Sequence, residues 1–445
     1  MLNLFILKWS GRPNAGSATW RLCIVQSAWK NRNLQLYFSG QFVSLIGTWM
    51  QQMALSWLVY RLTNSPMMLG VMGFTSQVPS LFFTPLAGIL ADRLNRHRII
   101  VVTQILSLIQ AAILAALVAT GKEQLWQLIV LSAFIGIINA FDLTTRQSFL
   151  VDMLDDIDQL KSAMGVNSSI NTLTRLVGPF LAGLFVAYAG EAMCFMANAA
   201  SYVAVIIALL FVKTRPKTAK LAGGNAVTQL KEAFTYTMQS QPIRDLILML
   251  AFIGVVTMPF AVLMPAFAKD VFHGNATTLG LLTGASSAGS VVGAIFLASR
   301  KETRDLSRWI IFGTALSGLG LVIFGFSTTM LMSLPSVAVI GFGTMVVMAG
   351  ANTVIQTLVD EDKRGRVMSF VIMAFMGTMP FGAVLAGGIA SKIGVGQTVL
   401  ATGLLTFILA LIFAKRIMQI NSKADSTQVL ESILESEAEL SEANV

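Results

Sequence analysis

Long apolar segments alternate with short polar and basic segments along almost the whole chain. An α-helix rises about 1.5 Å per residue, so about 20 apolar residues cross the roughly 30 Å hydrocarbon core of a bilayer. Twelve segments have the length and composition of such helices. They cover approximately residues 36–60, 66–91, 99–120, 125–147, 164–188, 192–212, 245–267, 277–299, 308–327, 331–356, 367–390 and 396–415. The pattern predicts an all-α integral membrane protein with about twelve transmembrane helices.

Basic residues lie mostly between these segments, and their placement predicts the orientation of the chain. With a cytoplasmic N-terminus, 26 of the 31 Lys and Arg residues fall in cytoplasmic segments, four fall in outer segments, and Arg175 alone lies within a span. This asymmetry is the positive-inside signal of membrane proteins. Because the number of spans is even, both termini are predicted to be cytoplasmic. The expected location is the plasma (inner) membrane, as a multi-pass protein.

The hydrophobic pattern is interrupted once, at the basic and polar residues 213–243, and the segments on either side echo each other. Leu69-Gly70 matches Leu279-Gly280 at an offset of 210, and Leu150-Val151-Asp152 matches Leu358-Val359-Asp360 at an offset of 208. Transporters built from parallel halves show such weak internal symmetry. The sequence therefore predicts two six-helix, pseudo-symmetric halves.

This interruption divides the chain into five regions. A cytoplasmic N-terminal extension precedes the first half, a cytoplasmic linker with a surface-lying helix joins the halves, and an acidic tail with little apolar content follows the second half. The tail is predicted to be disordered. The boundaries are 1–33 for the extension, 34–212 for the N-terminal half, 213–243 for the linker, 244–418 for the C-terminal half and 419–445 for the tail.

Composition excludes several classes of function. The chain is 55% hydrophobic and 12% charged, whereas soluble domains carry roughly 25% charged residues. The net charge of +9 reflects topology and predicts no nucleic-acid partner. The two cysteines, Cys23 and Cys194, form no metal-binding or redox pattern. No hydrolase constellation and no glycine-rich phosphate loop are present, so we expect neither an enzyme nor an ATP-driven pump, and no cofactor or metal.

The string GILADRLNRHRII after the second span is the most specific motif in the sequence. It places Gly88, Asp92, Arg93, Arg96 and Arg98 at the predicted cytoplasmic membrane surface. Asp92 can accept hydrogen bonds from a facing helix N-terminus while Arg93 pairs with an acid, which would hold the two halves together as a gate latch. The alternative is a merely basic loop that sets topology.

This string resembles the signature between the second and third helices of the major facilitator superfamily. Asn95 stands where that family usually has glycine; because Asn tolerates the left-handed conformation, a tight turn is still expected there. The resemblance implies the major facilitator fold, in which two six-helix halves alternate access to a central cavity.

Three further strings resemble the branch of this superfamily that contains the enterobactin exporter and macrolide efflux proteins. Thr144 replaces a proline of the branch, and the resemblance covers approximately residues 34–418. The matching residues are Phe141, Asp142, Arg146 and Gln147 in the fourth span, Arg175, Gly178, Pro179 and Gly183 in the fifth, and Arg364, Gly365 and Arg366 at the start of the eleventh, which join the predicted gate motif.

The charged residues of the fourth and fifth spans are candidates for proton coupling, because ionisable groups inside a membrane are costly. If Asp142 alternates between pairing with an arginine and binding a proton, transport is coupled to a proton gradient. The alternative is a permanent structural partner for Arg93 or Arg146. Arg175 has a similar choice between binding an anionic substrate group and holding the fifth span against a neighbour.

Gly178, Pro179 and Gly183 resemble the glycine-proline motif of exporters in the superfamily. Proline bends the helix, and glycines allow close helix approach. The motif favours export, and generic close packing is the alternative.

The substrate cavity is predicted from composition, because 23 Met and 28 Phe offer flexible and aromatic surfaces suited to bulky amphipathic molecules. The candidate substrate-binding residues are Gln52, Gln77, Phe141, Met258 and Phe375.

Together these features predict a proton-coupled secondary exporter of bulky amphipathic compounds, of the drug or siderophore class, that works as a monomer in the lipid bilayer. The alternatives are a lipid or lysophospholipid flippase on the same scaffold, and a non-transporting membrane sensor or adaptor that uses the acidic tail.

Overall fold

The structure, a computed structural model, describes residues 32–154, 157–212, 226–300, 306–361, 363–414 and 416. The described part of the chain is helical and contains no strand. The helices of the N-terminal part are α2 (Arg32–Thr63), α3 (Pro66–Arg93), α4 (Arg96–Ala119), α5 (Leu125–Asp152), α6 (Ile157–Ala189), α7 (Glu191–Phe211) and α8 (Ala226–Gln239). The C-terminal part has α9 (Gln241–Phe252), η2 (Ile253–Thr257), α10 (Phe260–Ala266), η3 (Phe267–Val271), α11 (Ala276–Ala298), α12 (Leu306–Phe326), α13 (Met330–Leu358), α14 (Arg364–Met376), α15 (Met379–Ile393) and a last helix, Val395–Ala414.

Eleven membrane-capable helices, each long and apolar enough to cross a bilayer, are found among the described residues. This confirms the all-α membrane class. The first predicted span corresponds to α2, which is long enough but falls short in hydropathy because polar residues such as Gln51 and Gln52 lie within it. Of the predicted linker, residues 213–225 lie outside the described residues, and α9 begins at Gln241, three positions before the predicted second half.

The seventh span is not one continuous α-helix. It runs from α9 through the π-helical turns η2 and η3, with the short α10 between them. Pro259 precedes α10 and Pro265 lies within it. Proline lacks the N–H that an α-helix needs, and the wider π turns are local departures from the α-helical pattern near these positions.

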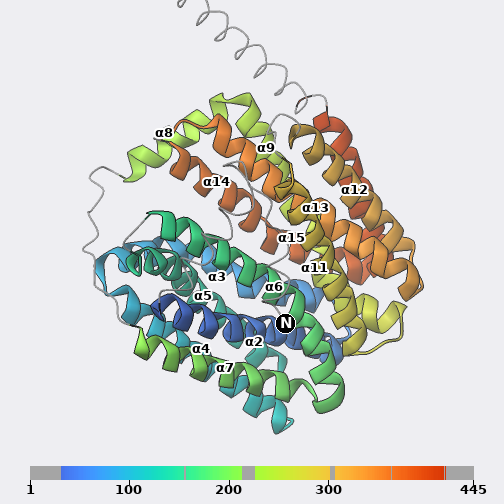
Figure 1. The fold of residues 1–445 in the computed structure, drawn as a ribbon. Coiled ribbons are helices and arrows are strands. Elements are labelled where there is room, and N and C mark those ends of the chain that lie inside the picture. The colour runs from blue at the N-terminus through green and yellow to red at the C-terminus, as the bar shows by residue number, and fades with distance from the viewer. Residues whose placement is uncertain are drawn as a thin grey trace, which may run out of the picture.

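The helices form two groups. Figure 1 shows α2 to α7, in blue to green, on one side and α9 to α15, in yellow-green to orange, on the other. We call the end of the bundle with the loops near residues 64, 190 and 273 the sealed end, and the end with the loops near residues 94 and 360 the latch end.

The buried apolar side chains explain how the two groups are joined. At the sealed end a single cluster contains residues of both groups, including Trp57 and Leu69 from one and Leu263 and Leu279 from the other. Toward the latch end each group has its own cluster. One comprises residues of α9 and of the helices packed on it, and the other comprises residues such as Phe149 of the first group. Because apolar burial holds helices together, the two groups share a core at the sealed end and have separate cores at the latch end.

Glycines allow helices of the two groups to approach each other closely at the sealed end. A Cβ on Gly387 of α15 would lie 3.2 Å from Cα of Gly70 in α3, and a Cβ on Gly280 of α11 would lie 3.1 Å from Cα of Gly183 in α6. Gly70 and Gly280 are the echo positions in the sequence. Each therefore contacts a glycine of the opposite group at an equivalent crossing of two helices.

Candidate functional site

The latch motif forms an ion-pair cluster at the junction of α3, α4 and α5. Arg96 donates to both carboxylate oxygens of Asp152, at 2.8 and 3.0 Å, and lies 3.3 Å from the carboxylate of Asp92. It also donates to the carbonyl of Ala91. Arg96 therefore clamps three helices of the same group. Sequence reasoning missed Asp152 as its partner because the two residues meet only through tertiary packing.

The other motif residues face open space in this conformation. Arg93 and Arg98 are exposed, and no described acid pairs with Arg93. Nothing among the described residues lies within 4 Å of a Cβ built on Gly88. The expected tight turn at Asn95 is present, because only two residues separate α3 from α4. Its expected left-handed conformation is wrong: φ of Asn95 is −67°, and its side chain caps α4 by accepting a hydrogen bond from the backbone N–H of Arg98. A short polar side chain serves equally well as an N-cap.

The basic residues at the start of α14 also contact their own group. Arg366 lies 3.9 Å from Glu232 of α8, and Arg364 lies 3.8 Å from Glu361. Gly365 faces open space among the described residues. The two halves of the predicted latch therefore do not meet in this conformation.

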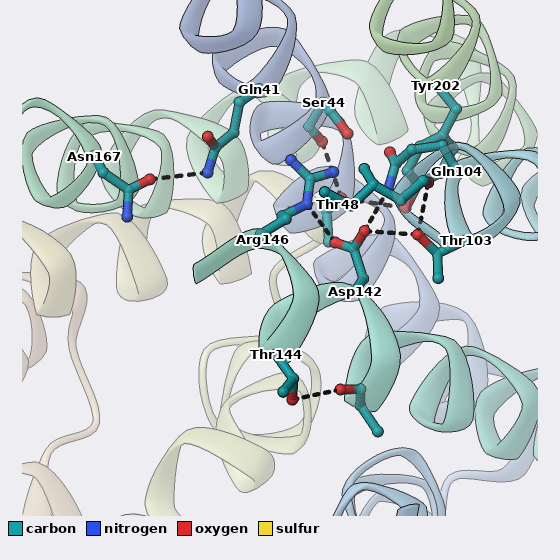
Figure 2. A network of polar contacts seen from close by, with 12 residues as sticks. Gln41, Ser44, Thr48, Thr103, Gln104, Asp142, Thr144, Arg146, Asn167 and Tyr202 are labelled. Carbon is teal, nitrogen blue, oxygen red and sulfur yellow. Dashed lines mark hydrogen bonds and ion pairs between the residues drawn. The ribbon is translucent and has the colours of Figure 1, made fainter. Parts of the chain in front are cut away.

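Asp142 lies at the centre of a polar network (Figure 2). Arg146 donates to one carboxylate oxygen at 2.5 Å, one helical turn away, while Thr103 and Gln104 of α4 donate to the other, each at 2.8 Å. Tyr37 of α2 lies near the Arg146 guanidinium and interacts with it electrostatically. Side-chain exposure is 19% for Asp142 and 12% for Arg146. The geometry is that of a half-buried, neutralised ion pair.

The network continues through the rest of this group of helices. Gln41 of α2 donates to Asn167 of α6 at 3.0 Å, as Figure 2 shows. Deeper in the bundle, Gln51 donates to Gln110 at 3.0 Å and accepts from Asn198 at 2.8 Å. Gln51 thereby joins α2, α4 and α7. Sequence reasoning missed this polar connection.

Arg175 lies near the middle of α6, and its guanidinium is 5.6 Å from the centre of the Trp49 ring. No acid among the described residues pairs with it, and its side chain is exposed. Its carbonyl accepts a hydrogen bond from Ser287 of α11 at 3.0 Å. Arg175 therefore sits where α6 meets the opposite group.

The glycine-proline motif places α6 against both neighbours. A Cβ on Gly178 would lie 2.5 Å from Cβ of Trp49, so α2 packs directly on this position. The carbonyl of Gly183 accepts a hydrogen bond from Thr277 at 3.2 Å. Pro179 is buried within the helix between these two crossings.

The five candidate substrate-binding residues do not gather at one place. Gln52 is exposed, Gln77 donates to the carbonyl of Gly73 in its own helix, and Phe141 lies against Phe83. Met258 packs on the latch-end core of the C-terminal group, and Phe375 is buried inside that core at 6% exposure.

Two polar contacts that the sequence did not predict close the sealed end. The Tyr60 hydroxyl of α2 donates to the carboxylate of Asp270 in η3, and Lys269 donates to Asn64 at 2.6 Å. Both contacts join the two groups of helices. They could not be recognised in the sequence because the partners are more than 200 positions apart.

Known proteins resemble the chain over most of its length. It is 24% identical to the staphyloferrin A transporter of Staphylococcus aureus, over 85% of this chain and 94% of that protein. It is 21% identical to macrolide efflux protein A of Streptococcus pyogenes, over 86% of this chain and 96% of that protein. It is 24% identical to the multidrug efflux pump Tap of Mycolicibacterium fortuitum, over 81% of this chain and 89% of that protein.

Solved transporter structures share the fold. A bacterial homologue of the human lysosomal transporter Spinster, in an inward-facing and unoccupied conformation, superposes with a TM-score of 0.68 at 15% identity, over 91% of this chain and 99% of that one. The nucleoside transporter NupG superposes with a TM-score of 0.69 at 15% identity, over 86% of this chain and 98% of that one. These similarities confirm the expected major facilitator fold.

The model of the MFS family described as transmembrane secretion effector matches residues 28–441. That range contains both groups of helices, the latch motif and the Asp142 network. The chain therefore belongs to the transmembrane secretion effector family of the major facilitator superfamily, whose members are membrane transporters and not enzymes.

Proposed function

We propose that this protein is a proton-coupled secondary exporter of bulky amphipathic small molecules, of the drug or siderophore class, that works by alternating access. The observation that carries the proposal is the arrangement of the cores: the two groups of helices share one core at the sealed end and have separate cores at the latch end. Such a molecule is closed on one side and separated on the other, as one end state of an alternating-access cycle requires.

The latch end is the cytoplasmic end in this proposal. The segments on that side carry 26 of the 31 Lys and Arg residues, and the positive-inside rule assigns them to the cytoplasm, together with both termini. The structure then corresponds to the inward-open state, in which an exporter loads its cargo. Residues 34–212 and 244–418 are the two moving halves, joined by 213–243, and a monomer is the working unit.

The relatives support the substrate class. Their names specify staphyloferrin A, macrolides and multiple drugs, and two of the three are named for efflux. A siderophore, a macrolide and a set of drugs share moderate to large size and mixed polarity, so the common feature is a bulky amphipathic cargo.

Asp142 is the proposed proton-binding group. In the inward-open state its carboxylate is held by Arg146, Thr103 and Gln104. Binding of a proton neutralises the carboxylate and weakens its attraction to Arg146. The freed guanidinium would then favour a different packing of α5 against α2 and α4, which links protonation to the change of state.

The latch residues act in the opposite state. When the cytoplasmic ends approach, Asp92 and Arg93 come to face the start of α14, where Arg364 and Arg366 can meet the freed Asp92 carboxylate. In the inward-open state Asp92 is 58% exposed and weakly paired, so little is lost when it changes partner.

The test is accumulation of macrolides, dyes and siderophores in efflux-deficient cells that express this chain, measured with and without a protonophore. The proposal predicts lower accumulation than in cells with the empty vector, and loss of this difference on addition of the protonophore. Confirmed membrane expression with no difference for any compound would contradict export of this class, and transport of a labelled lysophospholipid would then support the flippase.

A further inference from the structure

Arg175 is a membrane-embedded cation without a matching anion. It lies 18 residues from the start of α6 and 14 from its end, which is about 27 Å and about 21 Å of helix at 1.5 Å per residue. No acid among the described residues pairs with it. An uncompensated charge at this depth is costly and marks a functional position.

The Arg175 side chain lies on the polar face of α6. Ser168 and Asn171 are exposed and lie within roughly 40° of Arg175 around the helix, at 3.6 residues per turn. Within two turns of Arg175, the exposed apolar residues Leu173 and Phe180 lie on the other side of the helix, roughly 140 to 160° away. Arg175 therefore faces the space between the two halves, not the lipid.

The remaining charges of the helix interiors do not balance Arg175. Asp142 and Arg146 neutralise each other at 2.5 Å. Lys269 and Asp270 lie at the sealed end, within the last π turn before the loop. Asp245, buried in α9, lies near Arg416. Among the described residues of the helix interiors, Arg175 is therefore a positive charge that no acid neutralises, and such a charge attracts an anionic group and repels a cationic one.

Trp49 supplies a flat surface beside this charge. The guanidinium already contacts the ring at 5.6 Å, and α2 is held against α6 at Gly178, which fixes the position of Trp49. Arginine binds carboxylates through two parallel hydrogen bonds, and tryptophan stacks on planar apolar groups. The pair offers an anion site next to an aromatic site.

We propose that Arg175 and Trp49 form a subsite for an anionic group, carboxylate in type, attached to a planar or apolar body, so that the protein selects anionic over cationic amphiphiles. This inference rests on the proposed export function and names its substrate class. The alternative role for Arg175 is structural, as a brace between α6 and α2.

Two probes on the same xanthene scaffold test the charge preference: fluorescein, an anion at slightly alkaline pH, and tetramethylrhodamine methyl ester, a cation. Binding of each probe to the purified full chain in lipid nanodiscs is followed by fluorescence anisotropy. Wild-type protein is expected to bind fluorescein at least tenfold more tightly. Arg175→Gln is expected to remove this preference, and Arg175→Lys to retain part of it.

Arg300→Gln is the matched control. Arg300 also stacks on aromatic rings, those of Phe296 and Trp309, but it lies two residues past the latch end of α11. This variant should keep the wild-type preference. A purely structural role for Arg175 would instead lower the melting temperature of Arg175→Gln in nanodiscs and weaken binding of both probes equally, which would overturn the proposal.

Proteoliposome flux of the same probes separates the two hypotheses. Binding of fluorescein that depends on Arg175 without any flux supports the subsite and contradicts export. Proton-driven flux of the cation that is unchanged in Arg175→Gln supports export and overturns the subsite. Absence of fluorescein binding also overturns it.

Discussion

A methyl group added at Gly387 should open the sealed end, whereas the same methyl group at the next residue should not. In Gly387→Ala the new Cβ would lie 2.6 Å from the carbonyl oxygen of Pro66 and 3.2 Å from Cα of Gly70. Both atoms are backbone of the opposite half and cannot rotate away. In Gly388→Ala the nearest atom is the Met67 sulfur at 3.6 Å, an ordinary contact at the end of a flexible side chain.

The size of the effect follows from this overlap. Ordinary contacts begin near 3.4 Å, so α3 and α15 must separate by up to 0.8 Å at this crossing. Overpacking of this kind costs about 1–3 kcal/mol, which corresponds to a shift of about 5- to 150-fold between two states. Both variants gain the same helix propensity from alanine. The difference in conformational equilibrium between the two variants therefore reports the contact of residue 387 with α3 alone.

Pulsed electron paramagnetic resonance measures the shift directly. Spin labels at Leu62 and Lys392, both exposed at the sealed end, report separation of the two halves in a chain whose native cysteines are replaced. Gly387→Ala is expected to add a longer distance that Gly388→Ala lacks. The reasoning is refuted if a folded Gly387→Ala protein keeps the wild-type distance distribution.

Three further substitutions test other parts of the account. Asp142→Asn should abolish flux driven by a pH gradient and spare exchange of labelled for unlabelled substrate; a preserved response to the gradient would leave this acid with a structural role only. Gln51→Leu leaves two buried partners unsatisfied and should destabilise the protein by about 1–3 kcal/mol per group, read as a lower melting temperature, whereas the exposed Gln52→Leu should melt like wild type. Arg96→Gln leaves the half-buried Asp152 carboxylate without its cation and should lower the melting temperature as well. An unchanged melting temperature would show that the Arg96–Asp152 ion pair does not stabilise the protein.

The helical framework was predictable because hydropathy is a property of consecutive residues. Each predicted span corresponds to a helix or a run of helical segments that begins and ends within a few residues of the prediction. The exception is α6, which begins at Ile157, about two helical turns before the predicted start at residue 164. The Asp142–Arg146 pair was also visible, since residues four positions apart share one helix face. The tight turn at Asn95 was predictable, but its backbone conformation was not. Asn95 is not left-handed, because its side chain caps the start of α4.

Contacts between distant segments were not predictable in the same way. Gln41 and Asn167 are 126 positions apart, and Tyr60 and Asp270 are 210 positions apart. Phe375 illustrates a second reason: an aromatic residue on a central helix fits a cavity or a core equally well in sequence, and here the packing of α14 on α9 places it in the core.

The most direct test of the central claim is transport by the purified chain in proteoliposomes with an imposed pH gradient. A macrolide and fluorescein serve as cargo, and the gradient is applied in each direction and then collapsed with a protonophore. The account predicts cargo movement opposite to the proton flow, with loss of net movement when the gradient is collapsed. Cargo movement that is independent of the gradient, or that follows the proton flow, would contradict proton-coupled export.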